Sequence, residues 1–527
     1  MAFGASMAFR HAPVFASGVD SRIKVLLNES TGTISPAVYG HFTELLGAVV
    51  YDGIWVGENS KIPNTAGIRN TVIEKLRQIK APMVRWPGGC FADSYDWADG
   101  IGAPAKRPKR AGFWRGEPNA FGTPEFMSFC RLTGAEPYIA ANVRSLTPLD
   151  FDHWIEYCNA PAEGSSLGRM RADDGFSDPF NVKYWGVGNE AWGCGGNLTP
   201  AEYSEEFRKF TAWTPTYGEP LKFIAVGPSS DDLDWTEQFC LATFAGKRAI
   251  SPKSVFGWSI HHYTWDLARG KTHDWDTAKG DALQFDVVDW YEVFREGGKV
   301  EQIMLSNWDV LGRYDSDHNI KLVVDEYGTW YRPGTELDPS HTLGQQITLR
   351  DALLTAQTLD IFNRHADKMG IAACAQLINC LNSLFLSHED KFIVTPNFFV
   401  LDMYQSHQGA TAVRTEFSAP QVSYQRDGQP ATFWGLNGSA SIKGKTLTLT
   451  VVNPHATEHR EAEIALRGGS PSAAEATVLT NSDIHAHNTF DHPDAVATVS
   501  QKVQVAGGLI RYVFAPASVT KLSILVT

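Results

Sequence analysis

The sequence predicts an α/β protein: a (β/α)8 barrel of the TIM type followed by a C-terminal antiparallel β-sandwich. Between about residues 33 and 395, short apolar runs alternate with helix-like segments, the pattern of parallel βαβ units. After about residue 400, strand-like segments follow one another, separated by Gly, Asn, Asp and Pro. We expect an N-terminal segment, 1–32, that contributes a strand to the sandwich, a catalytic barrel, 33–395, and the sandwich, 396–527.

Eight apolar runs are the predicted barrel strands, and eight βα units are the number that closes such a barrel. Helix-like segments lie between them, for example 70–80, 123–134 and 199–213. In chain order, the runs are VYGHFTE (38–44), PMVRWPGG (82–89), PYIAANV (137–143), VKYWGVGNE (182–190), KFIAVG (222–227), FGWSIHHY (256–263), KLVVDEYG (321–328) and IAACAQLIN (371–379).

The two ends of the chain differ from the barrel region. C-terminal segments such as KTLTLTVVNPH (445–455) and HREAEIALRGG (459–469) alternate or run apolar between turn residues, which is typical of a β-sandwich. The segment SRIKVLLN (21–28) precedes the barrel, so we expect it to join the sandwich. The first 18 residues are rich in small side chains and are expected to be disordered. They lack a charged region followed by an apolar core, so we predict no signal peptide.

Charge and hydropathy exclude two classes of partner. The 527 residues include 46 basic and 59 acidic side chains, a formal net charge of −13. Nucleic acids and anionic membranes both attract basic faces, so we expect neither as a partner. No apolar run reaches the roughly 18 residues of a membrane-spanning helix, so no transmembrane helix is expected. The 16 tryptophans fit either a large core or platforms that stack on sugar rings.

The seven cysteines are an odd number, and none forms a CxxC pair. We therefore expect neither a disulfide framework nor a zinc ribbon. This usage favours a reducing compartment, hence the cytoplasm, with a periplasmic or secreted location left open if an export signal has been trimmed. We expect Cys90 and Cys194 to act as small apolar packing or pocket-lining residues.

Polar residues stand at the carboxyl end of nearly every predicted barrel strand, the end that carries the active site in this fold. Glu190 ends the fourth run and Glu326 the seventh. Opposite sides of a barrel mouth can bring two carboxylates within about 5 Å, the spacing that suits retaining glycoside hydrolysis. The other polar strand ends are Glu44, Arg85, Asn142, Asn189, His261, His262, Tyr263, Asp325, Gln376 and Asn379.

Other chemistries fit these residues less well. GVGNEA (186–191) loosely matches a dinucleotide-binding turn, but no clear helix follows it and its carboxylate would repel a pyrophosphate. His261 and His262 have no HExxH-like spacing around them, so we expect no metal and no cofactor. The serine-hydrolase motif GxSxG is absent. A non-catalytic carbohydrate-binding protein with an inactive barrel stays an alternative from a different class.

Six stretches resemble the α-L-arabinofuranosidases of glycoside hydrolase family 51, and the resemblance covers nearly the whole chain. Their order and spacing also match. They are GHFTELLGAVVYDGIW (40–55), VRWPGGCFADSYDWADGIG (84–102), EYCNAPAE (156–163), WGVGNE (185–190), DEYGTWY (325–331) and AQLIN (375–379).

The resemblance implies a retaining, exo-acting enzyme that removes terminal non-reducing arabinofuranose from arabinoxylan- or arabinan-derived saccharides without a cofactor. Glu190 matches the family's acid/base, Glu326 its nucleophile and Asn189 the residue that holds the sugar 2-hydroxyl. Homo-oligomers, often hexamers, are also implied. The remaining implied substrate-binding residues are Arg85, which orients the nucleophile, Tyr263 beside it, Glu44 and Gln376 as sugar ligands, Trp114 and Trp330 as aromatic walls, and His261 as a hydrogen-bonding partner.

The sequence also departs from the family pattern. Cys90 stands where some members have Asn, and a thiol is a weak donor, so this sugar contact is expected to be softer. Tyr327 and Gly328 replace a common Trp-Asn pair. The segments 193–198 and 265–293 are expected near the rim. These departures bear on the aglycone, so an endo-acting glucanase or xylanase of the same clan stays an alternative.

Overall fold

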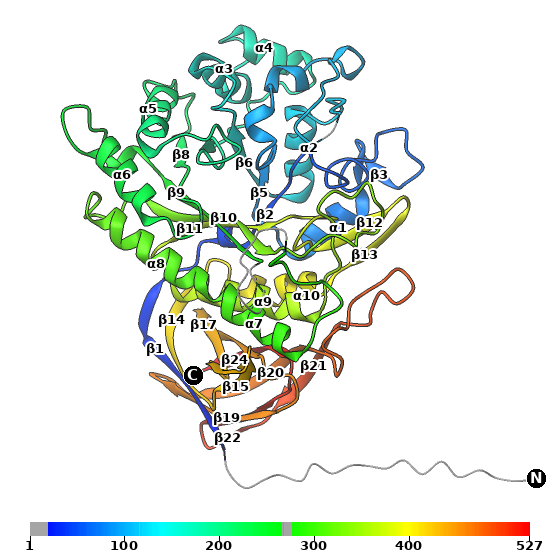
Figure 1. Cartoon of the computed structure of the whole chain (residues 1–527), viewed down its shortest axis with the longest axis vertical. Helices are drawn as coiled ribbons and strands as arrows, with labels where there is room; N and C mark the ends of the chain where they lie inside the picture. Colours follow the sequence, from blue (N-terminus) through cyan, green and yellow to red (C-terminus); the bar gives the residue numbers. More distant parts are fainter. Residues whose placement is uncertain (1–18, 115, 266, 268–276) are drawn as a thin grey trace, which may run out of the picture.

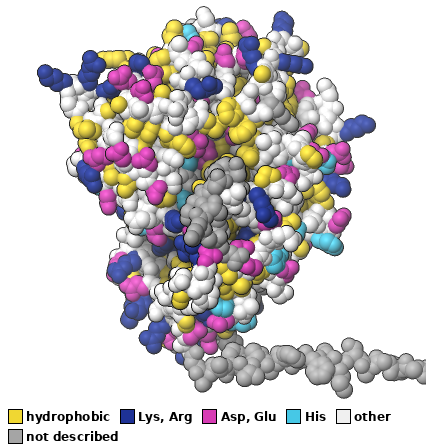
Figure 2. Space-filling model, in the orientation of Figure 1, with side chains coloured by type: hydrophobic (Ala, Val, Ile, Leu, Met, Phe, Trp, Pro, Cys, Tyr) yellow, Lys and Arg dark blue, Asp and Glu magenta, His cyan; other side chains and the backbone are white. Residues whose placement is uncertain are grey.

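The computed structural model describes residues 19–114, 116–265, 267 and 277–527. A barrel and a C-terminal sheet lie against each other, with α9 (Leu349–Arg364) between them (Figure 1). The predicted disorder of the first 18 residues falls outside the described part of the chain. Acidic and basic side chains are interspersed on the face shown in Figure 2. Among the described residues, no helix is both long and apolar enough to span a membrane.

The barrel is closed by parallel strands, which confirms the predicted fold class. Around the ring the described strands follow the order β10-β11-β2-β5-β6-β7-β8-β9. Each of the eight predicted runs overlaps one of them. They are β2 (Gly40–Phe42), β5 (Met83–Trp86), β6 (Glu136–Ala141), β7 (Tyr184–Val187), β8 (Lys222–Ala225), β9 (Gly257–Thr264), β10 (Lys321–Thr329) and β11 (Met369–Ala375).

Side chains fill the inside of the barrel, so it is a core and not a channel. Met83, Tyr138, Ile224, Val323 and Ile371 come from five different strands and form one buried cluster. Residues two apart on a strand face the same side, so the residues further along the same face of each strand point into the barrel mouth.

Helices surround the barrel, and several of them begin with strong capping signals. Thr147 and Thr199 accept a hydrogen bond from the backbone N–H three residues on, and a proline takes the first helical position after each of them. The described helices are α1 (Asn70–Gln78), α2 (Thr123–Thr133), α3 (Pro148–Asn159), α4 (Ser166–Asp173), α5 (Pro200–Thr211), α6 (Leu233–Phe244), α7 (Val287–Gly297), α8 (Lys299–Gly312), α9 and α10 (Pro396–Tyr404).

The C-terminal region forms a sheet with the described order β21-β20-β24-β18-β17-β14-β1-β19-β23-β22. Its pairs are antiparallel except β1 with β19. Strands from both halves bury side chains in one apolar cluster, so the sheet closes over its own core as a sandwich does. The strands are β1 (Ser21–Thr33), β14 (Thr411–Ser418), β17 (Asn437–Lys443), β18 (Thr446–Asn453), β19 (Arg460–Arg467), β20 (Pro471–Thr480), β21 (Thr498–Val503), β22 (Val505–Ala506), β23 (Leu509–Phe514) and β24 (Ser518–Val526).

Short hairpins complete the described strands. One precedes α1, a second precedes α10, and the third lies between β14 and β17. Their strands are β3 (Asn64–Thr65) with β4 (Ile68–Arg69), β12 (Phe385–His388) with β13 (Lys391–Val394), and β15 (Val422–Arg426) with β16 (Gln429–Phe433).

A buried carboxylate on α9 ties the barrel to the sheet. Asp360 accepts hydrogen bonds of 2.6 Å from the hydroxyls of Ser439 and Thr450, and one of 2.8 Å from the hydroxyl of Tyr404. Burial raises the pKa of Asp360 to about 7, although these hydrogen bonds oppose the shift. We therefore expect the contact between the two regions to depend on pH.

Candidate active site

A pocket of about 610 Å³ opens where the barrel strands end. Nine of the eleven predicted site residues line it, and Arg85 and Asn189 lie buried beneath it. The nine are Glu44, Cys90, Trp114, Glu190, His261, Tyr263, Glu326, Trp330 and Gln376. Trp265 also lines the pocket; residues 266 and 268–276 of the insert that it begins lie outside the described part of the chain.

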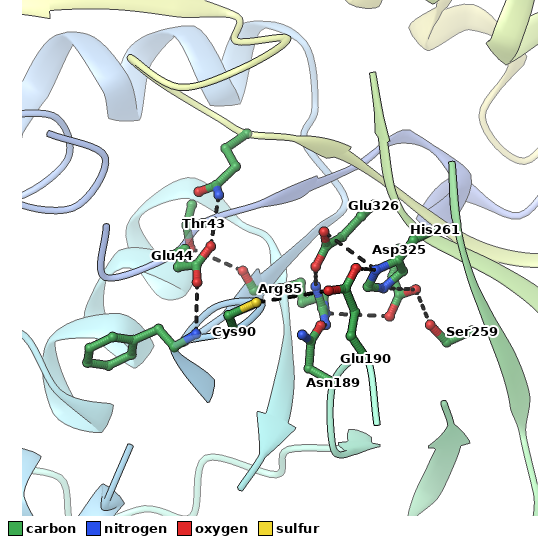
Figure 3. A network of polar contacts seen from close by, with 12 residues as sticks. Thr43, Glu44, Arg85, Cys90, Asn189, Glu190, Ser259, His261, Asp325 and Glu326 are labelled. Atoms are coloured by element: carbon green, nitrogen blue, oxygen red, sulfur yellow. Dashed lines mark hydrogen bonds and ion pairs between the residues drawn. The ribbon is translucent and has the colours of Figure 1, made fainter. Parts of the chain in front are cut away.

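Arg85, in β5, is the centre of the polar network (Figure 3). One guanidinium nitrogen donates to Glu326 at 2.7 Å, a second donates to the side-chain oxygen of Asn189 at 2.7 Å, and Nε lies 3.4 Å from Asp325. The ring of Phe42 lies 4.7 Å from the guanidinium carbon. Although burial opposes the charge, Asp325 and Glu326 raise the pKa of Arg85 above its usual value. Arg85 thus connects the ends of the fourth and seventh barrel strands.

The two predicted catalytic carboxylates face each other across the pocket. Single ligand atoms of Glu190, His261 and Glu326 all lie within 4.8 Å of one another. Glu190 has a φ of 37°, a region that costs a non-glycine residue about 1–3 kcal/mol and is held only by surrounding structure. Gly89 lets the chain approach closely, since a Cβ there would lie 2.9 Å from Glu326 Oε1. The spacing is that of a paired-carboxylate glycosidase.

His261, in β9, bridges the carboxylates. Its Nδ1 lies 2.9 Å from Glu190 Oε1 and 3.5 Å from Glu326 Oε2, while Nε2 lies 3.4 Å from Asp325. Burial disfavours the imidazolium, but the surrounding carboxylates outweigh it and raise the pKa of His261 to about 10. His261 is therefore protonated at neutral pH, and both ring nitrogens donate hydrogen bonds.

Glu44 closes the other side of the pocket. It accepts hydrogen bonds from the Phe91 backbone N–H at 2.9 Å, the Trp114 indole at 2.8 Å and the Gln376 amide at 3.0 Å. Burial raises the pKa of Glu44 to about 7, against the effect of these donors. The buried Gln376 Oε1 has no hydrogen-bond partner among the described residues, and Gln376 lines the pocket beside Glu44.

Tyr263 and Trp330 form the wall next to Glu326. The Tyr263 hydroxyl donates to Glu326 Oε2 at 2.7 Å, and burial raises its pKa well above the usual value. The Trp330 ring packs edge-on against Tyr263 with centroids 5.1 Å apart. Each oxygen of Glu326 therefore has its own donor, Arg85 on one side and Tyr263 on the other.

Asp93 is a site residue that we did not predict from the sequence. Its side chain accepts the backbone N–H of Asn189 and that of Val143, both at 2.9 Å. It thus ties together the ends of the third and fourth barrel strands directly beneath Glu190. Gly195 makes room for this link, because a Cβ there would lie 1.8 Å from the Asn189 carbonyl oxygen. The one available signal was a carboxylate inside the glycine-rich stretch after β5.

Ser259 and Tyr138 were also missed. The Ser259 hydroxyl donates to one Asp325 oxygen at 2.6 Å and the Tyr138 hydroxyl to the other at 2.8 Å. Arg85 and His261 lower the pKa of Asp325, even though burial acts in the opposite direction. Ser259 lies two residues before His261 on one strand, so the two-residue period of a strand could have identified it.

The expectation that Cys90 and Cys194 are separate thiols is wrong. The two side chains form a disulfide, with Cα atoms 5.5 Å apart and 104 residues between them in the sequence. Cys90 does line the pocket, as predicted, but a disulfide sulfur has no proton to donate. The pairing could not be inferred from the sequence spacing, because adjacent loops of a barrel meet only once the barrel has closed. The other five cysteines are buried and unpaired in the described chain.

Among the described residues, two groups of side chains have the spacing of metal ligands. Glu190, His261 and Glu326 form one, and Cys90, Glu190 and Cys194 form the other. The protonated state of His261 works against the first group, since a metal ligand must be the neutral imidazole. In the second group, both sulfurs are held in the disulfide.

Comparison with known proteins agrees with this site. Profiles described as "Alpha-L-arabinofuranosidase 1 domain" and "Alpha-L-arabinofuranosidase C-terminal domain" match residues 75–279 and 325–518. The intracellular exo-α-L-arabinofuranosidase of Bacteroides ovatus is 36% identical over 498 residues, 93% of each chain. The family 51 arabinofuranosidase structure from Xanthomonas axonopodis pv. citri has a TM-score of 0.89 at 34% identity, over 96% of this chain and 100% of that one. The arabinose complex of the α-L-arabinofuranosidase from Thermotoga maritima has a TM-score of 0.82 at 28% identity. This match also covers 96% of this chain and 100% of that one.

The fold and the paired carboxylates together define a glycoside hydrolase with a (β/α)8 barrel. The similarity over almost the full length places it more narrowly. The chain belongs to glycoside hydrolase family 51, and its activity is that of an α-L-arabinofuranosidase. The family predicted from the six sequence stretches is thereby confirmed.

Proposed function

We propose that this enzyme is a retaining, exo-acting α-L-arabinofuranosidase that releases terminal non-reducing arabinofuranosyl residues from arabinoxylan- or arabinan-derived saccharides. The observation that carries the proposal is the pair of carboxylates, Glu190 and Glu326, within 4.8 Å at the ends of the fourth and seventh barrel strands. A separation near 5 Å leaves no room for a water between them and suits a covalent intermediate.

Glu326 acts as the nucleophile in the first step. Hydrogen bonds from Arg85 and Tyr263 orient its carboxylate. One oxygen attacks the anomeric carbon, and the bond from that carbon to the leaving oxygen breaks. Glu190 gives its proton to the leaving oxygen, so the aglycone departs as an alcohol. In the second step Glu190 takes a proton from water, and the resulting hydroxide displaces Glu326 with net retention.

The remaining pocket residues hold the sugar. Asn189, fixed by Arg85, is placed for the 2-hydroxyl next to the reacting carbon. Glu44 and the unpartnered Gln376 oxygen offer acceptors for other hydroxyls. Trp114 and Trp330 supply aromatic walls. The volume of about 610 Å³ is that of a small-molecule pocket, which supports a terminal sugar as substrate.

Location and assembly are also proposed. The curated names of the relatives from Bacteroides ovatus and Streptomyces lividans both contain the word intracellular. These names support a cytoplasmic location for this enzyme. Homo-oligomers, including the hexamer implied by the family resemblance, stay a prediction.

Replacing each carboxylate tests the mechanism. In Glu190→Ala, an aryl α-L-arabinofuranoside with a good leaving group should still form the covalent intermediate, but deglycosylation should slow about 10²- to 10⁴-fold. In Glu326→Ala both steps should be lost. The measurement is burst-phase kinetics, with the anomer of the first product followed by NMR.

A matched control keeps this test specific. Glu301 pairs with His365 and Arg364 on the outer helices, so Glu301→Ala should keep the wild-type rate. An inverted product, or equal and mild losses in the two active-site variants, would contradict the assignment. Turnover of aryl β-D-xylopyranoside or β-glucan in place of the arabinofuranoside would favour the endo-acting alternative.

A further inference from the structure

The Cys90–Cys194 disulfide lies against the carboxylate of Glu190. Figure 3 shows the Cys90 sulfur beside this carboxylate. Cys90 Sγ is 3.9 Å and Cys194 Sγ 3.6 Å from Glu190 Oε2. The other oxygen of this carboxylate, Oε1, contacts His261. One side of Glu190 is thus anchored to the barrel, and its other side faces two sulfur atoms.

We propose that reduction of this disulfide creates a binding site for a thiophilic divalent cation, with Zn²⁺ as the representative ion. Its ligands are the two sulfurs and Glu190 Oε2. We further propose that the bound ion inhibits the enzyme. The inhibitory part rests on the proposed acid/base role of Glu190, whereas the metal site itself does not.

The distances already match those of such a site. In a tetrahedral zinc site, with Zn–S of about 2.3 Å and Zn–O of about 2.1 Å, neighbouring sulfur and oxygen ligands lie about 3.6 Å apart. The observed separations from Glu190 Oε2 are 3.9 and 3.6 Å. Breaking the S–S bond lets the sulfurs separate to the roughly 3.8 Å that a shared ion requires. Three protein ligands leave a fourth position for water.

The chemistry balances with a dithiol as the reductant. The dithiol supplies two electrons and two protons, the S–S bond breaks, and the reductant becomes a cyclic disulfide. When the cation binds, the two Cys thiols release their protons and become thiolates. A cytoplasmic enzyme would meet reductants of this class continuously. We therefore expect the reduced state in the proposed cytoplasmic location.

The surroundings favour a cation at this point. Carboxylates outnumber cationic groups in the network. Cys90 and Cys194 are both partly exposed, and Cys90 lines the pocket, whereas the five other cysteines are buried. A reductant and an ion from solvent therefore reach this pair first. The charged groups of the network are Glu44, Glu190, Asp325 and Glu326 against Arg85 and His261.

Metal binding would occupy the oxygen that must carry the proton. A coordinated carboxylate is ionised, so it can neither protonate the leaving oxygen nor take a proton from water. Because the second oxygen of Glu190 contacts His261, this carboxylate has no free oxygen left. Inhibition should therefore affect both steps of catalysis and be reversed by a chelator.

The experiment measures zinc binding and activity on the same full-length enzyme. Thiols accessible in the native state are counted with a chromogenic disulfide reagent before and after treatment with dithiothreitol. The reductant is removed without oxygen, ZnCl₂ is added, and bound zinc is determined after desalting. We expect two new thiols and one zinc per chain after reduction. Without reduction, we expect no bound zinc. Turnover of an aryl α-L-arabinofuranoside should fall at least about tenfold with zinc and recover with EDTA.

Variants locate the ion. Cys194→Ser and Glu190→Gln should each lose zinc uptake, and uptake is the only readout taken from them. If Cys194→Ser fails to fold, alkylating both thiols of the reduced wild-type enzyme should abolish uptake in its place. Absence of new thiols, or equal zinc uptake with and without reduction, would overturn the site and leave the proposed glycosidase mechanism intact. Zinc uptake without inhibition would overturn the inhibitory role.

Discussion

Replacing Arg85 with lysine is the sharpest perturbation of the site. The change keeps one positive charge and most of the side-chain length, but it replaces a planar fork by a single nitrogen. Arg85 contacts Glu326, Asn189 and Asp325 with three different nitrogens. A lysine amine can keep the contact with Glu326. It then leaves the side-chain oxygen of Asn189 without its donor, while Asp325 loses an ion-pair contact and keeps its hydrogen bonds from Ser259 and Tyr138.

The structure sets the size of the effect. A hydrogen bond to a charged group contributes about 1.5–3 kcal/mol, so losing the one between Arg85 and Asn189 costs at least about 1.5 kcal/mol. If that cost falls on the transition state, kcat/KM drops by at least about tenfold. The loss should appear mainly in kcat, since Asn189 and Glu326 are the groups proposed to contact the reacting sugar most strongly in the transition state.

The assay compares kcat/KM on an aryl α-L-arabinofuranoside with the free energy of unfolding in urea. Arg171→Lys is the matched control, because Arg171 is equally buried but donates only to backbone carbonyls of Tyr157, Phe176 and Ser177. It should lose stability and keep its kcat. If folded Arg85→Lys retains kcat/KM within about threefold of the wild type, the network does not act as described.

Two further substitutions test buried carboxylates. In Asp93→Asn, one backbone N–H loses its acceptor, which should lower the free energy of unfolding by about 1–3 kcal/mol. It should lower kcat on substrates with poor leaving groups more than on those with good ones; an equal loss on both would mean that Asp93 does not position Glu190. Asp360→Asn tests whether the free energy of unfolding depends on pH through this carboxylate. The folded pKa of about 7 exceeds the unfolded value of about 3.9, so the Asp360 contribution is greatest below pH 4 and is lost as the pH rises through 7. The free energy of unfolding should fall by up to about 1.4 kcal/mol per pH unit. Urea unfolding between pH 5 and 7.5 should show this fall in the wild type and a flatter profile in the variant; identical slopes would refute it.

Much of the barrel could be predicted because its strands are local patterns. Each run is short, apolar and followed by a helix-like segment, and every one of them overlaps a strand of the closed ring. The candidate pocket followed from the same patterns. Strand ends share one face of a barrel, so polar residues at those ends, such as Glu190 and Glu326, had to meet there. The family resemblance then supplied expected roles that the strand pattern alone does not provide.

Contacts between distant segments could not be predicted in the same way. Cys90 and Cys194 are separated by 104 residues, and no local pattern records that the loops after β5 and β7 touch. Asp93 looks like an ordinary loop carboxylate until its oxygens meet the N–H groups of two strand ends. The parallel pairing of β1 with β19 likewise depends on how the chain returns after the barrel.

By itself the sequence determined the order of the elements, the face of the barrel that carries the chemistry and the two glutamates at its mouth. These features depend on hydropathy and on residue periods over a few positions. The tertiary structure decided which donors orient each carboxylate oxygen, that His261 carries a charge, and that two sulfurs lie against Glu190. Such properties depend on distances and burial between residues far apart in the chain, and those exist only once the barrel has closed.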